Sequence, residues 1–272
     1  MVSESEHILG VAVAQFVPTD DPSANIEQIE RLASLAVDRG ARLVVFPEYS
    51  SYFTATMGPD WVEAAEPLDG PFCRALAGVA SQRGIHVVAG MVETTDDPAR
   101  VSNTIVAFSP SGDLVAVYRK QHLYDAFGQK ESDWVVAGPL GMPQTFVVRE
   151  LTVGLQTCYD IRFPEVTRRL VDAGADLVLV PSEWVRGPLK EQHWRTLATA
   201  RALENTVYLA AADHAPPIGV GNSFVIDPMG VELVTIGENT DVAVAWISRE
   251  RVEAVREINP ALALRRFRVE PI

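Results

Sequence analysis

The 272-residue sequence has only two cysteines, Cys73 and Cys158, and it lacks the marks of several protein classes. Two cysteines make no disulfide framework, so a reducing cytoplasm is the expected location. The first ten residues do not follow the basic, apolar and small-residue order of a signal peptide, and no apolar run approaches the length of a membrane span. We therefore expect a cytoplasmic protein that neither spans nor binds a membrane.

Basic residues are also scarce, because 23 lysines and arginines stand against 36 acidic residues and give a net charge of -13. No basic patch stands out, which argues against nucleic acid or an anionic membrane as a partner. The five histidines lack the spacing of metal ligands. A Gly-x-Ser-x-Gly elbow, a Walker loop, a Gly-x-Gly-x-x-Gly fingerprint and a Cys-x-x-Cys pair are all absent. We expect neither a metal nor a cofactor.

Apolar residues make up 47 % of the chain, which is enough for one large domain or two small ones. Helical patterns alternate with strand patterns, and no linker or repeat divides residues 1–272. Helices are expected from Pro22 to just before Gly40 and at 71–83, 164–173, 189–203 and 249–257. Strands are expected at 8–16, 43–46, 85–92, 101–108, 114–118, 145–149, 151–157, 177–180, 206–212, 221–227, 231–236 and 242–247. The pattern predicts one α/β domain with a mixed sheet, or with two sheets packed on each other, plus a frayed segment 1–7 and a tail from about 258.

Three polar residues stand where predicted strands end: Glu48, Lys120 and Cys158. Side chains at the carboxyl ends of neighbouring strands converge on one crevice in α/β sheets. A helix is expected to begin at Pro164, and its amino end would favour the thiolate of Cys158. A carboxylate, an ammonium and a thiol in one crevice would supply a base, an oxyanion stabiliser and a nucleophile.

Each of these residues also has a structural interpretation. Glu48 could cap a helix or lie in a solvated loop, Lys120 could be an ordinary exposed lysine, and Cys158 could be a buried, inert thiol. Cys73 lies inside a helical apolar pattern, which favours core packing over reactivity. The segment 120–142 is irregular and polar, and long connections of this kind are usually functional or disordered.

Six motifs in fixed order resemble those of the nitrilase superfamily of carbon–nitrogen hydrolases. The motifs are Phe46-Pro-Glu48, Tyr118-Arg-Lys120-x-His-Leu, Glu131 followed by Gly138, Cys158-Tyr-Asp-x-Arg-Phe-Pro-Glu165, Ala200-Arg-Ala-Leu-Glu-Asn205 and Asn222-Ser-Phe-Val-Ile-Asp-Pro-Met-Gly230. The cysteine motif resembles the branch that holds ω-amidases and deaminated-glutathione amidases. The resemblance extends from Val11 to about Arg266. It implies a four-layer αββα sandwich with two mixed β-sheets, which pairs into a homodimer or a larger homo-oligomer.

The resemblance places the family's catalytic set on Glu48, Lys120, Cys158 and Glu131. Glu48 would take the thiol proton as a general base, and Cys158 would attack an amide carbonyl to form a thioester. Lys120 and the backbone N–H after Cys158 would stabilise the oxyanion. Glu48 would then activate water, while Glu131 would position the substrate amide or that water.

The resemblance further implies that Arg162 binds a substrate carboxylate, a task that suits the guanidinium fork. The alternative is a structural ion pair of Arg162 with Asp160 or Glu165. Four aromatic residues are candidates for lining the pocket or for packing beside it: Tyr52, Tyr124, Tyr159 and Trp184.

We therefore expect a thiol amidase that converts a small, carboxylate-bearing aliphatic amide to acid and ammonia. The alternatives are an N-carbamoyl amino-acid hydrolase, a nitrilase and a non-catalytic scaffold of the same fold. Carbamoyl hydrolases often have two adjacent arginines where this chain has Ile161-Arg162. The spacer from Gly187 to Trp194 is longer than is usual in this branch, and Asn222 and Met229 replace a common histidine and tryptophan. These departures leave the acyl group open.

Overall fold

Apolar side chains alternate between two different cores along the first strand, β1 (Ile8–Gln15). Leu9, Val11 and Val13 enter a core that lies between two sheets, whereas Ala12 and Ala14 enter a core beneath helices. Because successive side chains of a strand point to opposite faces, a strand that is apolar on both faces must be covered on both. The structure is a computed structural model that describes residues 7–272. The expected fraying of 1–7 therefore falls almost wholly outside the described residues.

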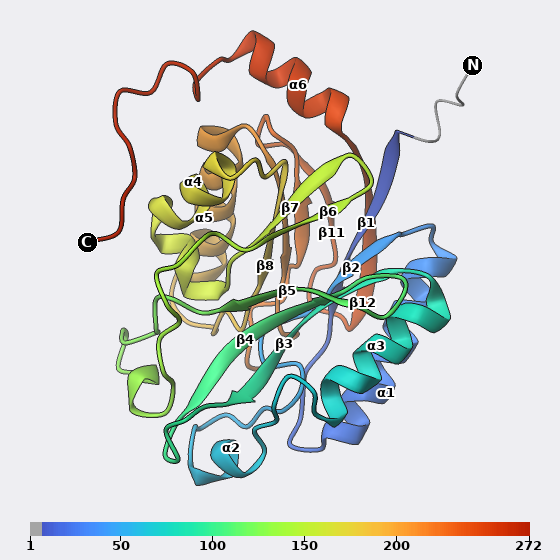
Figure 1. Cartoon of the computed structure of the whole chain (residues 1–272), viewed down its shortest axis with the longest axis vertical. Coiled ribbons are helices and arrows are strands. Elements are labelled where there is room, and N and C mark those ends of the chain that lie inside the picture. The colour runs from blue at the N-terminus through green and yellow to red at the C-terminus, as the bar shows by residue number, and fades with distance from the viewer. Residues whose placement is uncertain (1–6) are drawn as a thin grey trace.

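Two six-stranded sheets pack face to face (Figure 1). In spatial order, the first sheet consists of β12 (Asp241–Ser248), β1, β2 (Leu43–Val45), β3 (His86–Thr94), β4 (Val101–Phe108) and β5 (Leu114–Arg119). The second consists of β11 (Glu232–Thr235), β10 (Phe224–Ile226), β9 (Tyr208–Ala212), β8 (Leu177–Pro181), β7 (Leu151–Leu155) and β6 (Thr145–Val148). Strands β1, β2 and β3 are parallel, as are β7, β8 and β9, and the other pairs are antiparallel.

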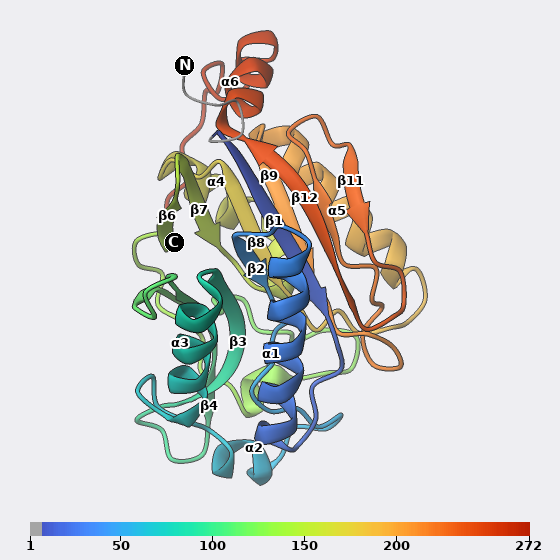
Figure 2. The ribbon, with the colours of Figure 1, turned by 90° about the vertical axis from the view of Figure 1, so that its right-hand side faces the viewer.

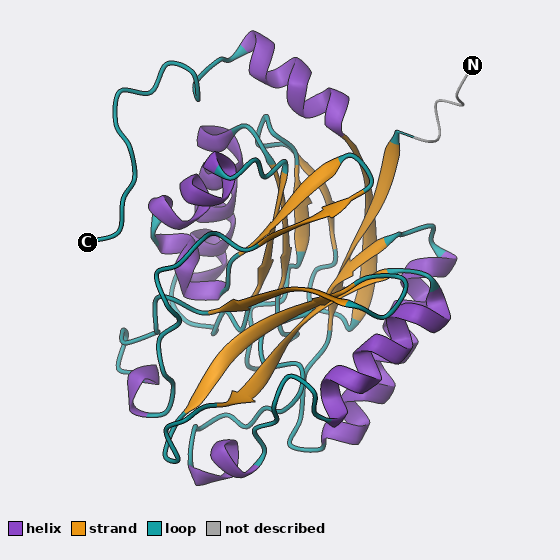
Figure 3. Ribbon diagram, viewed as in Figure 1, coloured by secondary structure: helices purple, strands orange, loops and turns teal. Residues whose placement is uncertain are grey.

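One pair of helices covers the outer face of each sheet (Figure 2). Helices α1 (Pro22–Asp38) and α3 (Pro71–Arg83) pack on the first sheet, and α4 (Pro164–Asp172) and α5 (Lys190–Asn205) pack on the second. The purple helices of Figure 3 therefore flank the orange strands on two sides. This arrangement confirms the expected αββα sandwich with two mixed sheets.

Several shorter or peripheral pieces complete the chain. Helix α6 (Arg249–Ile258) follows β12, and the tail beyond it returns to α4, where Arg265 pairs with Asp172 at 2.6 Å. Helix α2 (Pro59–Glu63) and the 3₁₀ turns η2 (Glu131–Asp133) and η3 (Cys158–Arg162) were not expected from the sequence. None of the described helices combines the length and the apolar character that crossing a membrane requires.

The strand ends that carry the candidate residues belong to different sheets. Glu48 follows β2 and Lys120 follows β5, and these two strands of the first sheet are separated by β3 and β4. Cys158 follows β7 in the second sheet. The expectation that they end neighbouring strands is therefore wrong. They meet because the two sheets face each other, so that loops from both sheets reach the same region.

Candidate active site

A buried lysine joins two buried carboxylates. The Nζ of Lys120 lies 2.9 Å from Glu48 Oε1 and 2.9 Å from Glu131 Oε2, and none of the three residues is more than 7 % exposed. Glu48 is thus not a solvated loop residue, and Lys120 is not an exposed lysine. Burial lowers the pKa of Lys120, but Glu131 and Glu48 outweigh burial and hold that pKa well above its usual value. Lys120 is therefore an ammonium ion.

Several donors hold Glu131 in place. Tyr49 donates its hydroxyl proton to Glu131 Oε1 at 2.6 Å, and the backbone N–H of Tyr124 donates to Oε2 at 2.5 Å. Asn103 Nδ2 donates to Glu131 Oε1 at 3.1 Å and to Glu48 Oε1 at 2.6 Å. Burial raises the pKa of Glu131, but Lys120, the Tyr49 hydroxyl and the Tyr124 N–H bring it below its usual value. Glu131 is accordingly a carboxylate held in place, and its hydrogen bonds connect Tyr49, Asn103 and Tyr124.

The backbone around Glu48 is held from two sides. His214 is fully buried, its pKa is lowered by burial to about 4, and its Nε2 donates to the carbonyl oxygen of Glu48 at 2.7 Å. On β3, a Cβ added to Gly90 would lie 2.6 Å from Glu48 Cα and 2.5 Å from the nitrogen of Tyr49. Only glycine allows the two backbones to approach this closely. Glu48 is therefore placed by residues distant in sequence.

Cys158 has a backbone conformation that is uncommon for a residue with a side chain. Its φ of 42° lies in the left-handed region, at the first residue of η3. Asp160 holds this turn, because its carboxylate accepts from the backbone N–H of Thr157 at 3.2 Å and from the hydroxyl of Tyr118 at 2.6 Å. Strained conformations that the surroundings maintain in this way are concentrated at functional sites.

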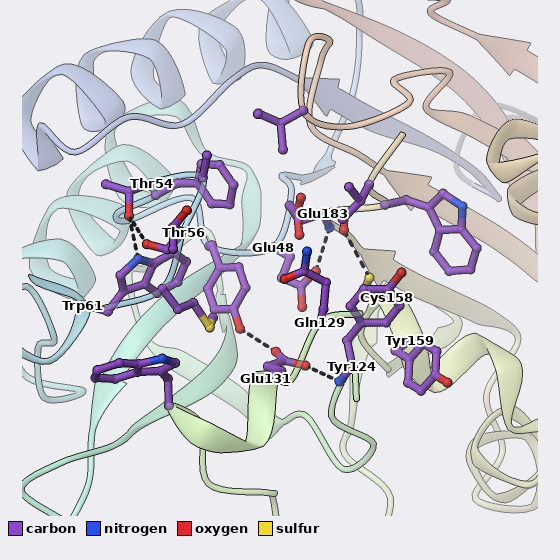
Figure 4. Close-up of a pocket in the computed structure, with 18 of the residues that line it drawn as sticks. Glu48, Thr54, Thr56, Trp61, Tyr124, Gln129, Glu131, Cys158, Tyr159 and Glu183 are labelled. Carbon is purple, nitrogen blue, oxygen red and sulfur yellow. Dashed lines mark hydrogen bonds between the residues drawn. The ribbon is translucent and has the colours of Figure 1, made fainter. Parts of the chain in front are cut away.

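The backbone of one residue, Glu183, connects the thiol to the carboxylate (Figure 4). The backbone N–H of Glu183 donates to Glu48 Oε2 at 2.6 Å, and the carbonyl oxygen of Glu183 lies 3.6 Å from Cys158 Sγ. Burial, followed by the charge of Glu48, raises the pKa of Cys158 well above its usual value. Lys120 acts in the opposite direction, but the net shift favours the thiol, contrary to the direction that the expected helix end would give.

Sequence reasoning did not identify Glu183, which follows β8. Burial and the nearby Glu48 raise the pKa of the Glu183 side chain well above its usual value, which favours the neutral acid. Asn103 and His214 were missed as well. None of the three lies in a local pattern that marks it, and only the pairing of distant strands brings them to Glu48.

A cavity of about 590 Å³ opens over these groups, with Cys158, Glu48, Lys120, Glu131 and Glu183 in its lining. Such a volume suits a small-molecule ligand. The candidates Tyr124, Tyr159 and Trp184 line it too, and Thr54, Thr56 and Trp61 lie across it from Cys158 in Figure 4.

Two candidate pocket residues do not line the cavity. Tyr52 donates to Asp60 at 2.8 Å and packs against Trp61. Arg162 lies behind the lining, with its guanidinium over the ring of Trp184 at 4.9 Å. Within residues 7–272, Arg162 makes no ion pair with Asp160 or Glu165. The expected alternative, a structural ion pair of Arg162, is therefore wrong.

The sequence matches the family model described as carbon-nitrogen hydrolase over residues 10–257. A hydrolase of Mycobacterium tuberculosis is 39 % identical, with 91 % of this chain and 92 % of the relative covered. A deaminated glutathione amidase of Escherichia coli O157:H7 is 38 % identical (94 % and 97 % covered), and an omega-amidase of Xenopus tropicalis is 30 % identical (94 % of each). Among solved structures, an amidase mutant from Nesterenkonia sp. AN1 has a TM-score of 0.76 at 26 % identity, with 94 % of this chain and 100 % of that chain covered. In that structure, acrylamide has undergone Michael addition at the active-site cysteine.

Proposed function

The chain belongs to the carbon–nitrogen hydrolase family and is a thiol amidohydrolase, and we propose that Cys158 is its nucleophile and a carboxylate-bearing aliphatic amide its substrate. The observation that carries the proposal is the backbone of Glu183, whose N–H donates to Glu48 and whose carbonyl oxygen contacts Cys158 in the lining of the cavity. Because the backbone of a single residue contacts both groups, the base and the thiol lie near each other, and the charge of Glu48 acts on the pKa of Cys158. The names of the amidase relatives support the substrate class.

In the first half of the proposed reaction, Cys158 Sγ attacks the amide carbonyl carbon while Glu48 accepts the thiol proton. The carbonyl oxygen becomes an oxyanion beside the ammonium of Lys120 and the backbone N–H of Tyr159. When this intermediate collapses, the C–N bond breaks and Glu48 returns the proton to the leaving nitrogen. The products are ammonia and a thioester on Cys158.

In the second half, Glu48 takes a proton from water, and the resulting hydroxide attacks the thioester carbonyl. The C–S bond breaks, the acid leaves and the thiol regains its proton. Glu131 is proposed to position the water or the amide through the hydrogen bonds that it shares with Lys120 and Asn103. Each group ends in its starting state, so the cycle needs no cofactor.

The test is a short exposure of the protein to succinamate, followed by intact-protein mass spectrometry and an ammonia assay. We expect an acyl adduct on Cys158 and stoichiometric ammonia. The panel should include α-ketoglutaramate, deaminated glutathione, N-carbamoyl amino acids and simple aliphatic amides. Carbon dioxide released together with ammonia would identify a carbamoyl hydrolase instead, and neither adduct nor ammonia with any compound would reject the proposal.

Alkylation of Cys158 by iodoacetamide is expected to accelerate with pH without levelling off below about pH 8.5, the usual range of a thiol. The reason is that burial and Glu48 raise the pKa of Cys158. Glu48→Gln removes a negative charge, so it should lower that pKa and move the profile to lower pH. Peptide mass spectrometry separates Cys158 from Cys73. A rate that is already constant between about pH 6 and pH 8 would indicate a resting thiolate and contradict the prediction.

The cellular setting completes the proposal. We propose that the enzyme works in the cytoplasm as a homodimer or a larger homo-oligomer, consistent with its two free cysteines and with the family resemblance. Analytical ultracentrifugation at micromolar protein concentration measures the number of subunits, and a monomer would contradict this part of the proposal.

A further inference from the structure

Two basic side chains beside the cavity have no carboxylate partner within residues 7–272. The first, Lys190, begins α5 and lines the cavity while only 7 % exposed. The second is Arg162, whose Nε and Nη2 are buried and meet no hydrogen-bond acceptor in the described chain. Buried charges are normally paired, because leaving water costs several kcal/mol per ion. A pair of uncompensated cations at the edge of a ligand cavity therefore points to an anion in the ligand.

Lys190 is held so that its ammonium faces the cavity. The indole N–H of Trp184 donates to the carbonyl oxygen of Lys190 at 2.9 Å, which fixes the backbone where α5 begins. The Nζ donates to the hydroxyl of Tyr124 at 2.7 Å and lies 4.8 Å from the centre of that ring and 4.4 Å from the centre of the Phe127 ring. An ammonium has three donors, and the tyrosine hydroxyl is a neutral partner that occupies one of them.

Arg162 adds a second positive charge near Lys190, although its own side chain does not line the cavity. Its guanidinium lies 4.9 Å from the centre of the Trp184 ring and 5.6 Å from that of the Phe127 ring, and Lys190 Nζ lies 5.5 Å and 4.4 Å from the same two centres. Burial lowers the pKa of Lys190, and the like charge of Arg162 lowers it further. An anion bound at Lys190 would relieve this repulsion as well as the desolvation.

The lysines of the cavity differ in whether a carboxylate pairs with them. The chain has three lysines, Lys120, Lys130 and Lys190, and all three line the cavity. Lys120 is neutralised by Glu48 and Glu131, and Lys130 by Asp133. Lys190 alone among them has no carboxylate. We propose that Lys190 binds the carboxylate of the substrate while the amide lies at Cys158, an inference that rests on the amidase function proposed above.

The experiment compares two substrates of equal length, succinamate and its neutral diamide, succinamide. In Lys190→Met we expect kcat/KM for succinamate to fall by about 10- to 100-fold, mainly through KM, because a charge-assisted hydrogen bond is lost. The loss for succinamide should be much smaller, so the ratio of the two kcat/KM values falls. Lys190→Arg should recover most of the preference. Lys130→Met is the matched control, because it removes a cavity lysine that is already paired, and it should leave the ratio unchanged.

A second measurement uses the wild-type protein and does not depend on turnover or on the folding of a variant. Acetylation of each lysine by an N-hydroxysuccinimide ester is followed by peptide mass spectrometry with and without succinate. Succinate should protect Lys190 and leave Lys130 unaffected. Equal losses for both substrates in Lys190→Met, or no protection of Lys190 by succinate, would overturn the inference. Protection by succinate in a protein that hydrolyses no amide would instead reject the proposed function and retain the carboxylate site.

Discussion

Cys158→Ala is expected to reduce amide hydrolysis by about 10⁴- to 10⁶-fold, the scale on which removal of a catalytic nucleophile acts. Without sulfur no thioester can form, and the fixed carboxylates and ammonium have no covalent step to assist. The fold should survive, because the change removes one atom from a residue at the cavity wall. Ammonia release measures the activity, intact-protein mass reports the missing adduct, and thermal unfolding checks the fold.

The chain offers a matched control in its other cysteine. Cys73 is 2 % exposed on α3, its sulfur lies 3.5 Å from the sulfur of Met91, and burial raises its pKa to about 12. Cys73→Ser should therefore keep nearly full activity and lose only about 1–2 kcal/mol of stability by burying a hydroxyl in the helix-covered core. Wild-type rates in Cys158→Ala, or loss of turnover in Cys73→Ser with normal folding, would contradict the assignment of the nucleophile.

Local signals were enough to predict most helices. Helix α3 begins at Pro71 and ends at Arg83 as expected. Both ends could be predicted from local sequence, because proline favours the first turn of a helix and glycine favours the position after the last turn. Gly84 has a φ of 62°, the left-handed conformation that ends such a helix at low cost. The five-residue α2 was missed, since one helical turn has no periodicity to detect.

The candidate site was predictable only in part. Glu48, Lys120 and Cys158 could be found because each interrupts an apolar pattern at a strand end. The face-to-face packing of two sheets that brings them together could not be predicted from any short stretch of sequence. The roles of Asn103 and His214 in holding Glu48 could not be predicted in this way either. The direction of the pKa shift of Cys158 could not be predicted either, because the helix end is a weak local field, whereas burial and the carboxylate of Glu48, which raise that pKa, depend on the assembled fold.

Lys120→Met is expected to lower both turnover and stability. Turnover should fall by at least about 10²- to 10³-fold, because an oxyanion donor is lost. Stability should fall by about 3–5 kcal/mol at neutral pH, because Glu48 and Glu131 are left as buried like charges without their cation. Lys130→Met is the control, since Lys130 forms an exposed pair with Asp133 and its loss should leave the unfolding midpoint nearly unchanged.

The stability loss of Lys120→Met should depend on pH with a definite sign. Lys120 is one of the groups that bring the pKa of Glu131 below its usual value, so without Lys120 burial raises that pKa in the folded state. A carboxyl whose pKa is higher in the folded than in the unfolded state favours folding at low pH, and this contribution is lost as pH rises through the folded-state pKa. Urea unfolding should therefore show a smaller deficit near about pH 5 than near about pH 8. A deficit that does not change with pH would mean that lost packing, and not the two carboxylates, destabilises the variant.

The double variant Lys120→Met/Glu131→Gln separates the structural role of Lys120 from its catalytic one. Replacing Glu131 by its neutral isostere removes one of the two unpaired charges, so much of the lost stability should return. The glutamine oxygen can still accept from the Tyr124 N–H, and its amide can donate to the hydroxyl of Tyr49. Turnover should stay as low as in Lys120→Met, because no cation is restored beside the oxyanion. If activity returned together with stability, Lys120 would act only by holding Glu48 and Glu131 in place, and the oxyanion would have to be stabilised by backbone N–H groups alone.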